Sequence, residues 1–240
     1  VAGELLAIRG QVIPSTLSNV TLVGSTVSGE TLIGETRVGN SSDRLRSLSL
    51  IPANPAAHPE AVRAIEDADL IVIGPGSLFT SIVPNLLIYD ISAALASSTA
   101  FKIYVCNVAE EPAQTEGYSV LDHSKVVQHY GGKGAIDAVL ANNNLPQRPT
   151  PAGLGFIRAN KPWSDDVLLV EADVIDETDD NSTARHDSVK LSNAIAEAYR
   201  EYRGRRRRLP RVRLNLDRNL PGNGDNLMTF ATLDQSDVRI

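Results

Sequence analysis

Three short apolar runs, interleaved with stretches of helical spacing, constrain the fold of this chain more than any other feature. The runs are "DLIVIG" (69–74), "FKIYVCN" (101–107) and "IDAVLANN" (136–143). A run that is apolar without alternation is typical of a strand covered on both faces. Residues 83–98 and 119–131 have helical spacing, and Gly131-Gly132 closes the second stretch. Strands that alternate with helices predict parallel βαβ units and a layered α/β fold.

The N-terminal part predicts antiparallel structure. Residues 19–39 alternate apolar and small polar side chains around Ser28-Gly29, which predicts a hairpin that extends the parallel sheet. Residues 11–15 and 44–52 predict two further strands. The first ten residues have the pattern of the end of a helix, and Met228 is the single methionine. We therefore expect the natural sequence to begin upstream.

The remaining predicted elements are a helix at 58–68, a strand at 165–172 and an amphipathic helix at 188–203. Beyond residue 203 the composition changes to a basic run followed by prolines, glycines and asparagines. We therefore place an α/β domain at 1–203 and an extension at 204–240. The extension is either a basic arm for an anionic partner or a lineage-specific tail.

Composition narrows the function classes. Of the 240 residues, 42% are hydrophobic and 22% charged, which is typical of a globular protein. The net charge of −6 argues against nucleic acid as the main partner, because neutralising phosphates requires a basic surface. The single cysteine, Cys106, excludes an internal disulfide framework and suits a reducing compartment. We find no run long enough to span a membrane and no signal peptide, and we expect a cytoplasmic protein.

The loop after the first apolar run is a candidate ligand site. It reads "GPGSLFTS" and contains Gly74, Gly76, Ser77, Thr80 and Ser81. Glycines allow the backbone to approach a ligand closely, and backbone N–H groups there can bind an anion. The loop matches neither the Walker pattern nor the dinucleotide fingerprint. Phosphate or nucleotide binding and a plain strand-to-helix turn both remain open.

Two further loops are candidates because ligands bind beyond the carboxyl ends of strands in an open α/β sheet. Asn107 follows the second apolar run, and its loop continues through Thr115–Tyr118. This asparagine either contacts a base or sugar or caps a turn. Arg185 lies just before the last helix, where it either binds a phosphate or pairs with Asp187.

The residues give no support for nucleophilic catalysis. Cys106 lies in an apolar run, the four histidines lack zinc-ligand spacing, and no G-x-S-x-G elbow occurs. Asp122 and His123 are adjacent on a predicted helix and so do not face one another, which favours packing over an acid/base role. The acidic stretch 171–180 lacks the calcium-loop pattern and predicts a solvated loop.

Three motifs together resemble a known family. "ADLIVIGPGSLFTSIVPNLL", "YVCNVAEEPAQTEGYSVLDH" and "RHDSVKLSNAI", in this order, are similar to the gluconeogenesis factor family, CofD-like relatives of 2-phospho-L-lactate transferase. The similarity extends from about residue 5 to about residue 200 and includes "LLAIRGQVIPST" and "NVTLVG". The transferase branch has a proline- and asparagine-containing sequence in place of "GPGSLFTS".

The resemblance implies a Rossmann-like three-layer α/β/α fold in a cytoplasmic bacterial protein. It also implies a link to gluconeogenic growth, cell shape and peptidoglycan precursor supply, and binding of a nucleotide sugar such as UDP-N-acetylglucosamine, without established catalysis. A homo-oligomer that responds to the ligand is compatible with this role. The expected ligand-binding residues are those of the three candidate loops, namely Gly74, Gly76, Ser77, Thr80, Ser81, Asn107, Thr115, Gly117, Tyr118 and Arg185.

This sequence departs from the family pattern in two places. The Gly-rich G-G-G-T-G turn with which family members begin is absent, and "AEEPAQTEG" (109–117) replaces the more usual "MTQPGETDG". Half of the expected diphosphate cradle therefore lies outside these residues. The alternative function is a Mg²⁺-dependent transferase of a phosphorylated group, and a third is an interaction scaffold that uses the basic extension.

Overall fold

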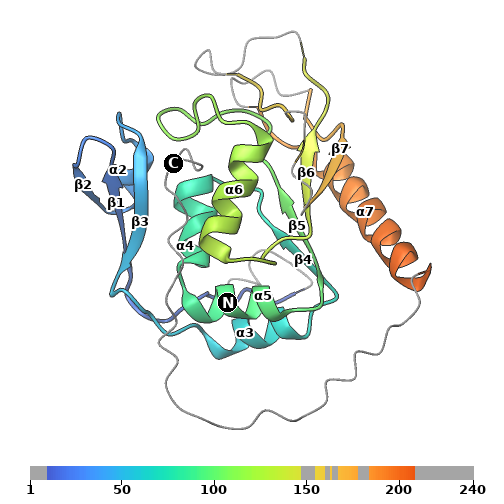
Figure 1. The fold of residues 1–240 in the computed structure, drawn as a ribbon, viewed down its shortest axis with the longest axis horizontal. Helices are drawn as coiled ribbons and strands as arrows, with labels where there is room; N and C mark the ends of the chain where they lie inside the picture. The colour runs from blue at the N-terminus through green and yellow to red at the C-terminus, as the bar shows by residue number, and fades with distance from the viewer. Residues whose placement is uncertain (1–9, 147–154, 160–162, 164–166, 178–183, 209–240) are drawn as a thin grey trace, which may run out of the picture.

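The structure, a computed structural model, describes residues 10–146, 155–159, 163, 167–177 and 184–208 (Figure 1). Within these residues the chain forms a four-stranded parallel sheet, β4-β5-β6-β7, and a separate three-stranded antiparallel sheet, β2-β1-β3. The strands are β1 (Thr21–Thr26), β2 (Thr31–Ile33), β3 (Leu45–Ile51), β4 (Leu70–Ile73), β5 (Phe101–Val105), β6 (Ala138–Asn142) and β7 (Leu168–Ala172). The helices are α2 (Glu35–Gly39), α3 (Pro59–Glu66), η1 (Leu78–Ile82), α4 (Val83–Leu86), α5 (Tyr89–Ser97), α6 (Val120–Gly131) and α7 (Ser188–Arg208). The predicted α/β fold is confirmed.

Helices cover both faces of the central strands β5 and β6, as their unbroken apolar runs require. The run at 69–74 forms the edge strand β4, which is only partly buried, with Val72 39% exposed. Phe101, Ile103 and Val105 of β5 pack in a core with α7, whereas Tyr104 and Cys106 pack in a second core with α4 and α6. Figure 1 shows α4, α5 and α6 on one side of the sheet and α7 on the other. All residues of β5 and β6 are buried, which explains why these two runs do not alternate apolar and polar residues.

All neighbouring strands of this sheet pair in parallel, so their carboxyl ends lie along one edge. Two hydrogen bonds join the three candidate loops at this edge. Ser77 of the loop after β4 contacts Glu111 of the loop after β5, and His186 of the segment before α7 contacts the Cys106 carbonyl oxygen. Ligand sites of open α/β sheets lie at this edge.

The predicted hairpin is confirmed, but the expectation that it extends the parallel sheet was wrong, because β1 pairs with β2 and β3 in a separate sheet. β1 and β2 are antiparallel, and Gly29 in their turn has a φ of 94°. The backbone N–H of Leu48 in β3 donates a hydrogen bond of 3.0 Å to the Tyr130 hydroxyl of α6, which joins this sheet to the body. The strand expected to continue to residue 39 instead turns at Gly34 (φ 96°) into α2, whose Val38 is fully buried.

Two expectations were wrong in detail. Residues 11–15 form no strand, and Thr16 instead makes an isolated bridge with Ala57. The single helix expected at 83–98 is broken at Ile88, which has extended backbone angles and a buried side chain. The break lets α4 pack against α6 and α5 pack against α3, which a straight helix could not do.

The last helix extends beyond the expected domain boundary. α7 continues through residue 208, so residues 204–208 of the expected extension are helical. Two predicted segments lie outside the described residues, namely the helix end at 1–9 and the rest of the extension, 209–240.

No single helix among the described residues is long and apolar enough to cross a membrane. Leu78–Leu86 and Tyr89–Ser97 reach that length and composition together, with a bend of 78° between them.

Gly131 allows the close approach of α6 to the segment before β6. A Cβ atom at this buried position would lie 2.7 Å from the Cβ of Ala135. We expect Gly131→Ala to lower the free energy of unfolding by about 1–3 kcal/mol, because the packed backbone must shift. Chemical denaturation measures the loss. Ala135→Gly in the same chain should recover part of it, and a double variant no more stable than the single one would contradict this account.

Candidate functional site

A pocket with a volume of about 470 Å³ lies at the carboxyl edge of the parallel sheet, and we call it the strand-end pocket. All three candidate loops contribute to it. Four residues predicted from the sequence line it, namely Gly76, Ser77, Asn107 and Arg185. The other lining residues are Pro75, Val108, Ala109, Glu110, Glu111, Pro112, Ala184 and His186.

The glycines after β4 are needed for the turn itself. Gly74 has a φ of 85°, which favours glycine, and a Cβ there would lie 3.2 Å from the Val105 carbonyl oxygen. A Cβ at Gly76 would lie 3.3 Å from the Cβ of Ser81. The turn therefore brings the backbone of Gly76 and Ser77 to the pocket wall. Gly74 itself does not line the pocket, and its role is to allow the turn.

Ser77 is held by the loop that follows β5. Its Oγ lies 3.1 Å from Glu111 Oε2 and 3.1 Å from Gln114 Oε1. The backbone N–H of Leu78 also donates to Glu111 Oε2, at 3.4 Å. Burial raises the pKa of Glu111, and these hydrogen bonds lower it by less.

The segment before α7 forms the opposite wall. His186 Nε2 lies 3.2 Å from the carbonyl oxygen of Cys106, which places Arg185 and His186 beside Asn107 in the pocket lining. Burial lowers the pKa of His186. Asp187 caps α7, since its Oδ1 accepts hydrogen bonds of 2.8 Å from the backbone of both Val189 and Lys190.

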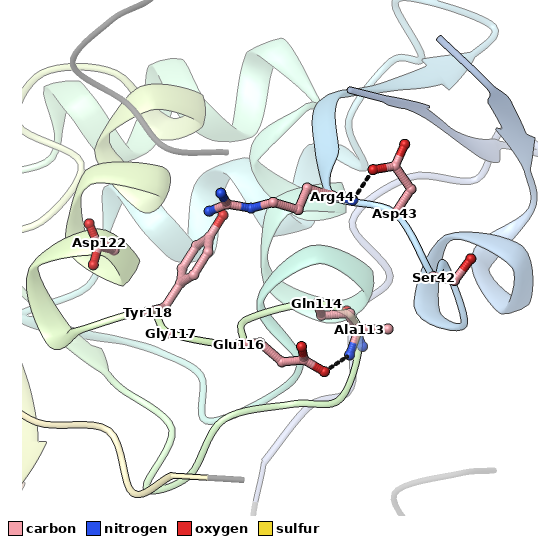
Figure 2. Close-up of a pocket in the computed structure, with 9 residues that line it drawn as sticks. All are labelled: Ser42, Asp43, Arg44, Ala113, Gln114, Glu116, Gly117, Tyr118 and Asp122. Atoms are coloured by element: carbon pink, nitrogen blue, oxygen red, sulfur yellow. Dashed lines mark hydrogen bonds between the residues drawn. The ribbon is translucent and has the colours of Figure 1, made fainter. Parts of the chain in front are cut away.

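Gly117 and Tyr118 line a different pocket of about 330 Å³, which we call the hairpin pocket (Figure 2). Its wall toward the antiparallel sheet consists of Ser42, Asp43 and Arg44, which the sequence analysis missed. Figure 2 shows the Arg44 guanidinium beside the Tyr118 hydroxyl. The one available sequence signal was the polar turn "SSDR" that precedes β3.

The carboxylates of the hairpin pocket are engaged with neighbouring groups of the chain. Asp43 accepts hydrogen bonds from the backbone of Ser28 and of Arg44, and hydrogen bonds from Ser28 hold its pKa at about 2. Glu116 accepts from the backbone N–H of Ala113 at 3.0 Å. These contacts fix the pocket walls.

The other predicted residues line neither pocket. Thr115 is fully buried, and its Oγ1 accepts a hydrogen bond of 2.9 Å from the Glu111 backbone. Thr80 is half-buried, and Ser81 is exposed with its N–H bonded to the Ser77 carbonyl. The structure brings these residues close to the strand-end pocket without placing them in its wall.

The profile of the family described as "2-phospho-L-lactate transferase CofD" matches residues 1–177, which is most of the chain. The chain belongs to the CofD family. A Nostoc sp. (strain PCC 7120) protein named "Putative gluconeogenesis factor" is 38% identical over 211 residues, which cover 82% of this chain and 45% of that protein. A Bacillus subtilis (strain 168) protein named "Gluconeogenesis factor" is 32% identical over 212 residues, which cover 82% and 64%.

Solved structures agree with this assignment. A crystal structure of a Bacillus halodurans protein matches the CofD-family chain with a TM-score of 0.75 at 30% identity, covering 80% of this chain and 64% of the other. The expected kinship with the gluconeogenesis factors is thus confirmed. The chain spans about half to two thirds of the length of these relatives.

Asp122 and His123 have structural roles in the CofD-family fold. Asp122 forms a capping box with Ser119 at the start of α6. His123 is buried against Tyr118, its Nδ1 lies 3.1 Å from the Ser119 carbonyl oxygen, and its Nε2 has no hydrogen-bond partner in the described part of the chain. Asp122 lines the hairpin pocket, whereas His123 is fully buried, so the two residues form no acid/base pair there.

Cys106 is buried, and burial raises the pKa of its thiol, so it is unsuited to act as a nucleophile. In the described ranges, no three or more His, Cys, Asp and Glu side chains are grouped to hold a metal ion.

Burial lowers the pKa of His123 to about 4 from 6.5, so the unfolded chain binds this proton more tightly than the folded chain. The contribution of neutral His123 to the free energy of unfolding is therefore complete above about pH 6.5. It is lost as the pH falls toward 4, and the loss is about 3 kcal/mol at most. We expect His123→Phe, which keeps a ring beside Tyr118, to flatten this part of the stability profile. His186 contributes in the same direction and remains in the variant. Urea unfolding at a series of pH values measures the slope, and an unchanged slope would contradict the assignment.

Ala113 is the non-glycine residue with a positive φ, 61°, in the described part of the chain. Replacing it with glycine removes a backbone strain of about 1 kcal/mol. We expect Ala113→Gly to raise the melting temperature, and Ala109→Gly in the same loop, where φ is not positive, to lower it. Equal effects of the two substitutions would show that strain at residue 113 is not the cause.

Proposed function

We propose that this chain is the ligand-binding part of a cytoplasmic nucleotide-sugar-binding regulatory protein, with a ligand of the UDP-N-acetylglucosamine type. The role would link gluconeogenic growth, cell shape and peptidoglycan precursor supply. The observation that carries the proposal is the convergence of the three candidate loops on one pocket at the carboxyl edge of the sheet. Family membership with the gluconeogenesis factors supports the gluconeogenic part.

The pocket offers chemistry that suits a diphosphate and its sugar. Arg185 supplies a guanidinium, which binds phosphate oxygens in pairs. The Asn107 amide and the Ser77 hydroxyl can bind sugar or base groups, and Gly76 lets the backbone approach closely. A pocket volume of about 470 Å³ can hold part of a nucleotide sugar.

Regulation would act through the segment before α7. Arg185 and His186 belong to this segment, and the His186 ring is joined to the end of β5. A ligand that contacts both walls would favour the arrangement in which they are held together. A partner, or a second copy of the chain, would then recognise that arrangement.

The alternative is a Mg²⁺-dependent transferase of a phosphorylated group, which the description of the family profile favours. Glu110 and Glu111 are the carboxylates of the strand-end pocket. Glu110 accepts from the Gly155 backbone and Glu111 from Ser77, so both carboxylates are already engaged through one oxygen each. Turnover of a nucleotide-activated substrate that requires Mg²⁺ would replace the regulatory proposal with this one.

Isothermal titration of the full-length protein with UDP-N-acetylglucosamine tests the binding function. We expect micromolar affinity, weakened at least about tenfold by Arg185→Ala because a charge-assisted contact is lost. Asn107→Ala should also weaken binding. Ser81→Ala is the matched control, because Ser81 is exposed and lies outside the pocket lining.

A folded protein that releases no heat at millimolar ligand would contradict the proposed function. Equal losses for Arg185→Ala and Ser81→Ala would place the binding site elsewhere.

A further inference from the structure

The Glu111 carboxylate lies where an anionic ligand would bind in the strand-end pocket. Its Oε2 accepts from two donors of the loop after β4, the Ser77 hydroxyl at 3.1 Å and the Leu78 backbone N–H at 3.4 Å. The Ser77 hydroxyl also lies 3.1 Å from Gln114 Oε1. A phosphate oxygen that approaches Ser77 would compete with the carboxylate for these two donors. The donors are therefore already satisfied by a side chain of the same pocket.

Hydrogen bonds within the loop after β5 fix the backbone of Glu111. The buried Thr115 hydroxyl accepts from the Glu111 backbone N–H at 2.9 Å, and the Glu111 carbonyl accepts from the Thr115 N–H at 3.0 Å. The backbone of Glu111 is thus fixed twice, while its carboxylate reaches the pocket. Moving the carboxylate aside requires rotation of the side chain without unfolding the loop.

The charges around the pocket oppose a second anion. Glu110 and Glu111 line one wall, and Arg185 and His186 line the other. Burial keeps His186 neutral near neutral pH, since it lowers the pKa of this side chain. Beneath the pocket, the buried Tyr104 lies close enough to Glu111 for the carboxylate to raise its pKa further. The formal charge of these groups is −1 when Glu111 is ionised.

We propose that Glu111 is a built-in competitor for anions, so that a phosphate-bearing ligand reaches Ser77 and Leu78 only when this carboxylate is protonated or displaced. The inference rests on the proposed function for the identity of the ligand and adds regulation by pH to the same site. Neutral Glu111 gives up the negative charge and can itself donate a hydrogen bond to a phosphate oxygen.

The raised pKa of Glu111 sets the direction of the pH dependence. As the pH falls toward this pKa, the fraction of neutral Glu111 rises and anion affinity increases. The diphosphate of a UDP-sugar has no proton to gain near neutral pH, so the change in affinity reports the protein. His186 can add a smaller increase of the same sign, and Arg185 stays charged throughout.

The test compares Glu111→Gln with Glu110→Gln in the full-length protein, using inorganic pyrophosphate and UDP-N-acetylglucosamine as separate probes. Both variants remove one charge from the same pocket, but Glu111 alone contacts Ser77 and Leu78. At about pH 7.5 we expect Glu111→Gln to bind pyrophosphate about tenfold more tightly than the wild type, because an ionic competitor is lost. We expect Glu110→Gln to change affinity about threefold or less.

Affinity for UDP-N-acetylglucosamine should rise in the wild type as the pH is lowered from neutrality toward the raised pKa of Glu111, and this rise should be largely absent in Glu111→Gln. Glu111→Ala is the second variant, because it removes the side chain entirely and should also tighten pyrophosphate binding. Circular dichroism checks that each variant is folded.

The outcomes separate this inference from the proposed function. Tighter pyrophosphate binding by Glu111→Gln, with no UDP-N-acetylglucosamine binding by any form, would support the inference and contradict the proposed ligand. Equal affinities of wild type and Glu111→Gln for UDP-N-acetylglucosamine at every pH would overturn the inference and support the function. Failure of every form to bind either probe would overturn both.

Discussion

The complete burial of β5 and β6 is the constraint on which the rest of the structure depends. A strand buried on both faces needs a paired strand on each side and covering layers above and below, because every backbone polar group must be paired inside the sheet. Here helices supply those layers, and the helical crossover connections from β4 to β5 and from β5 to β6 make these strands parallel. Parallel pairing then sends all the strand ends to one edge. The strand-end pocket follows from this arrangement, since the loops that leave the edge must turn away over it.

The sequence predicted the elements whose burial leaves a local pattern. The apolar runs at 69–74 and 101–107 became β4 and β5, and the capping box of Ser119 and Asp122 begins α6 where helical spacing begins. The break at Ile88 has no such pattern, because residues 83–98 keep helical spacing throughout. It is decided by tertiary packing against two different helices, which a local pattern cannot express.

The candidate site could be predicted only in part for a similar reason. Ser77 and Asn107 lie directly after strands, and the sheet topology alone brings them to one edge. Tyr118 lies eleven positions beyond Asn107, and by then the loop has turned toward the antiparallel sheet and the hairpin pocket. Thr115 is a polar residue of a candidate loop, yet its hydroxyl serves the loop backbone from a fully buried position. A sequence does not distinguish a hydroxyl that lines a pocket, such as that of Ser77, from one that bonds the loop backbone, such as that of Thr115.

The position of Glu111 shows how the same loop can serve both stability and binding. The reciprocal hydrogen bonds with Thr115 fix its backbone, and the positive φ of Ala113 turns the chain between the two pockets. Moving the carboxylate away from the Ser77 hydroxyl and the Leu78 N–H would break no hydrogen bond between two backbone groups. A pH-dependent binding site requires a fixed backbone and a side chain whose charge can change. The affinity for an anion then changes with pH while the fold stays constant.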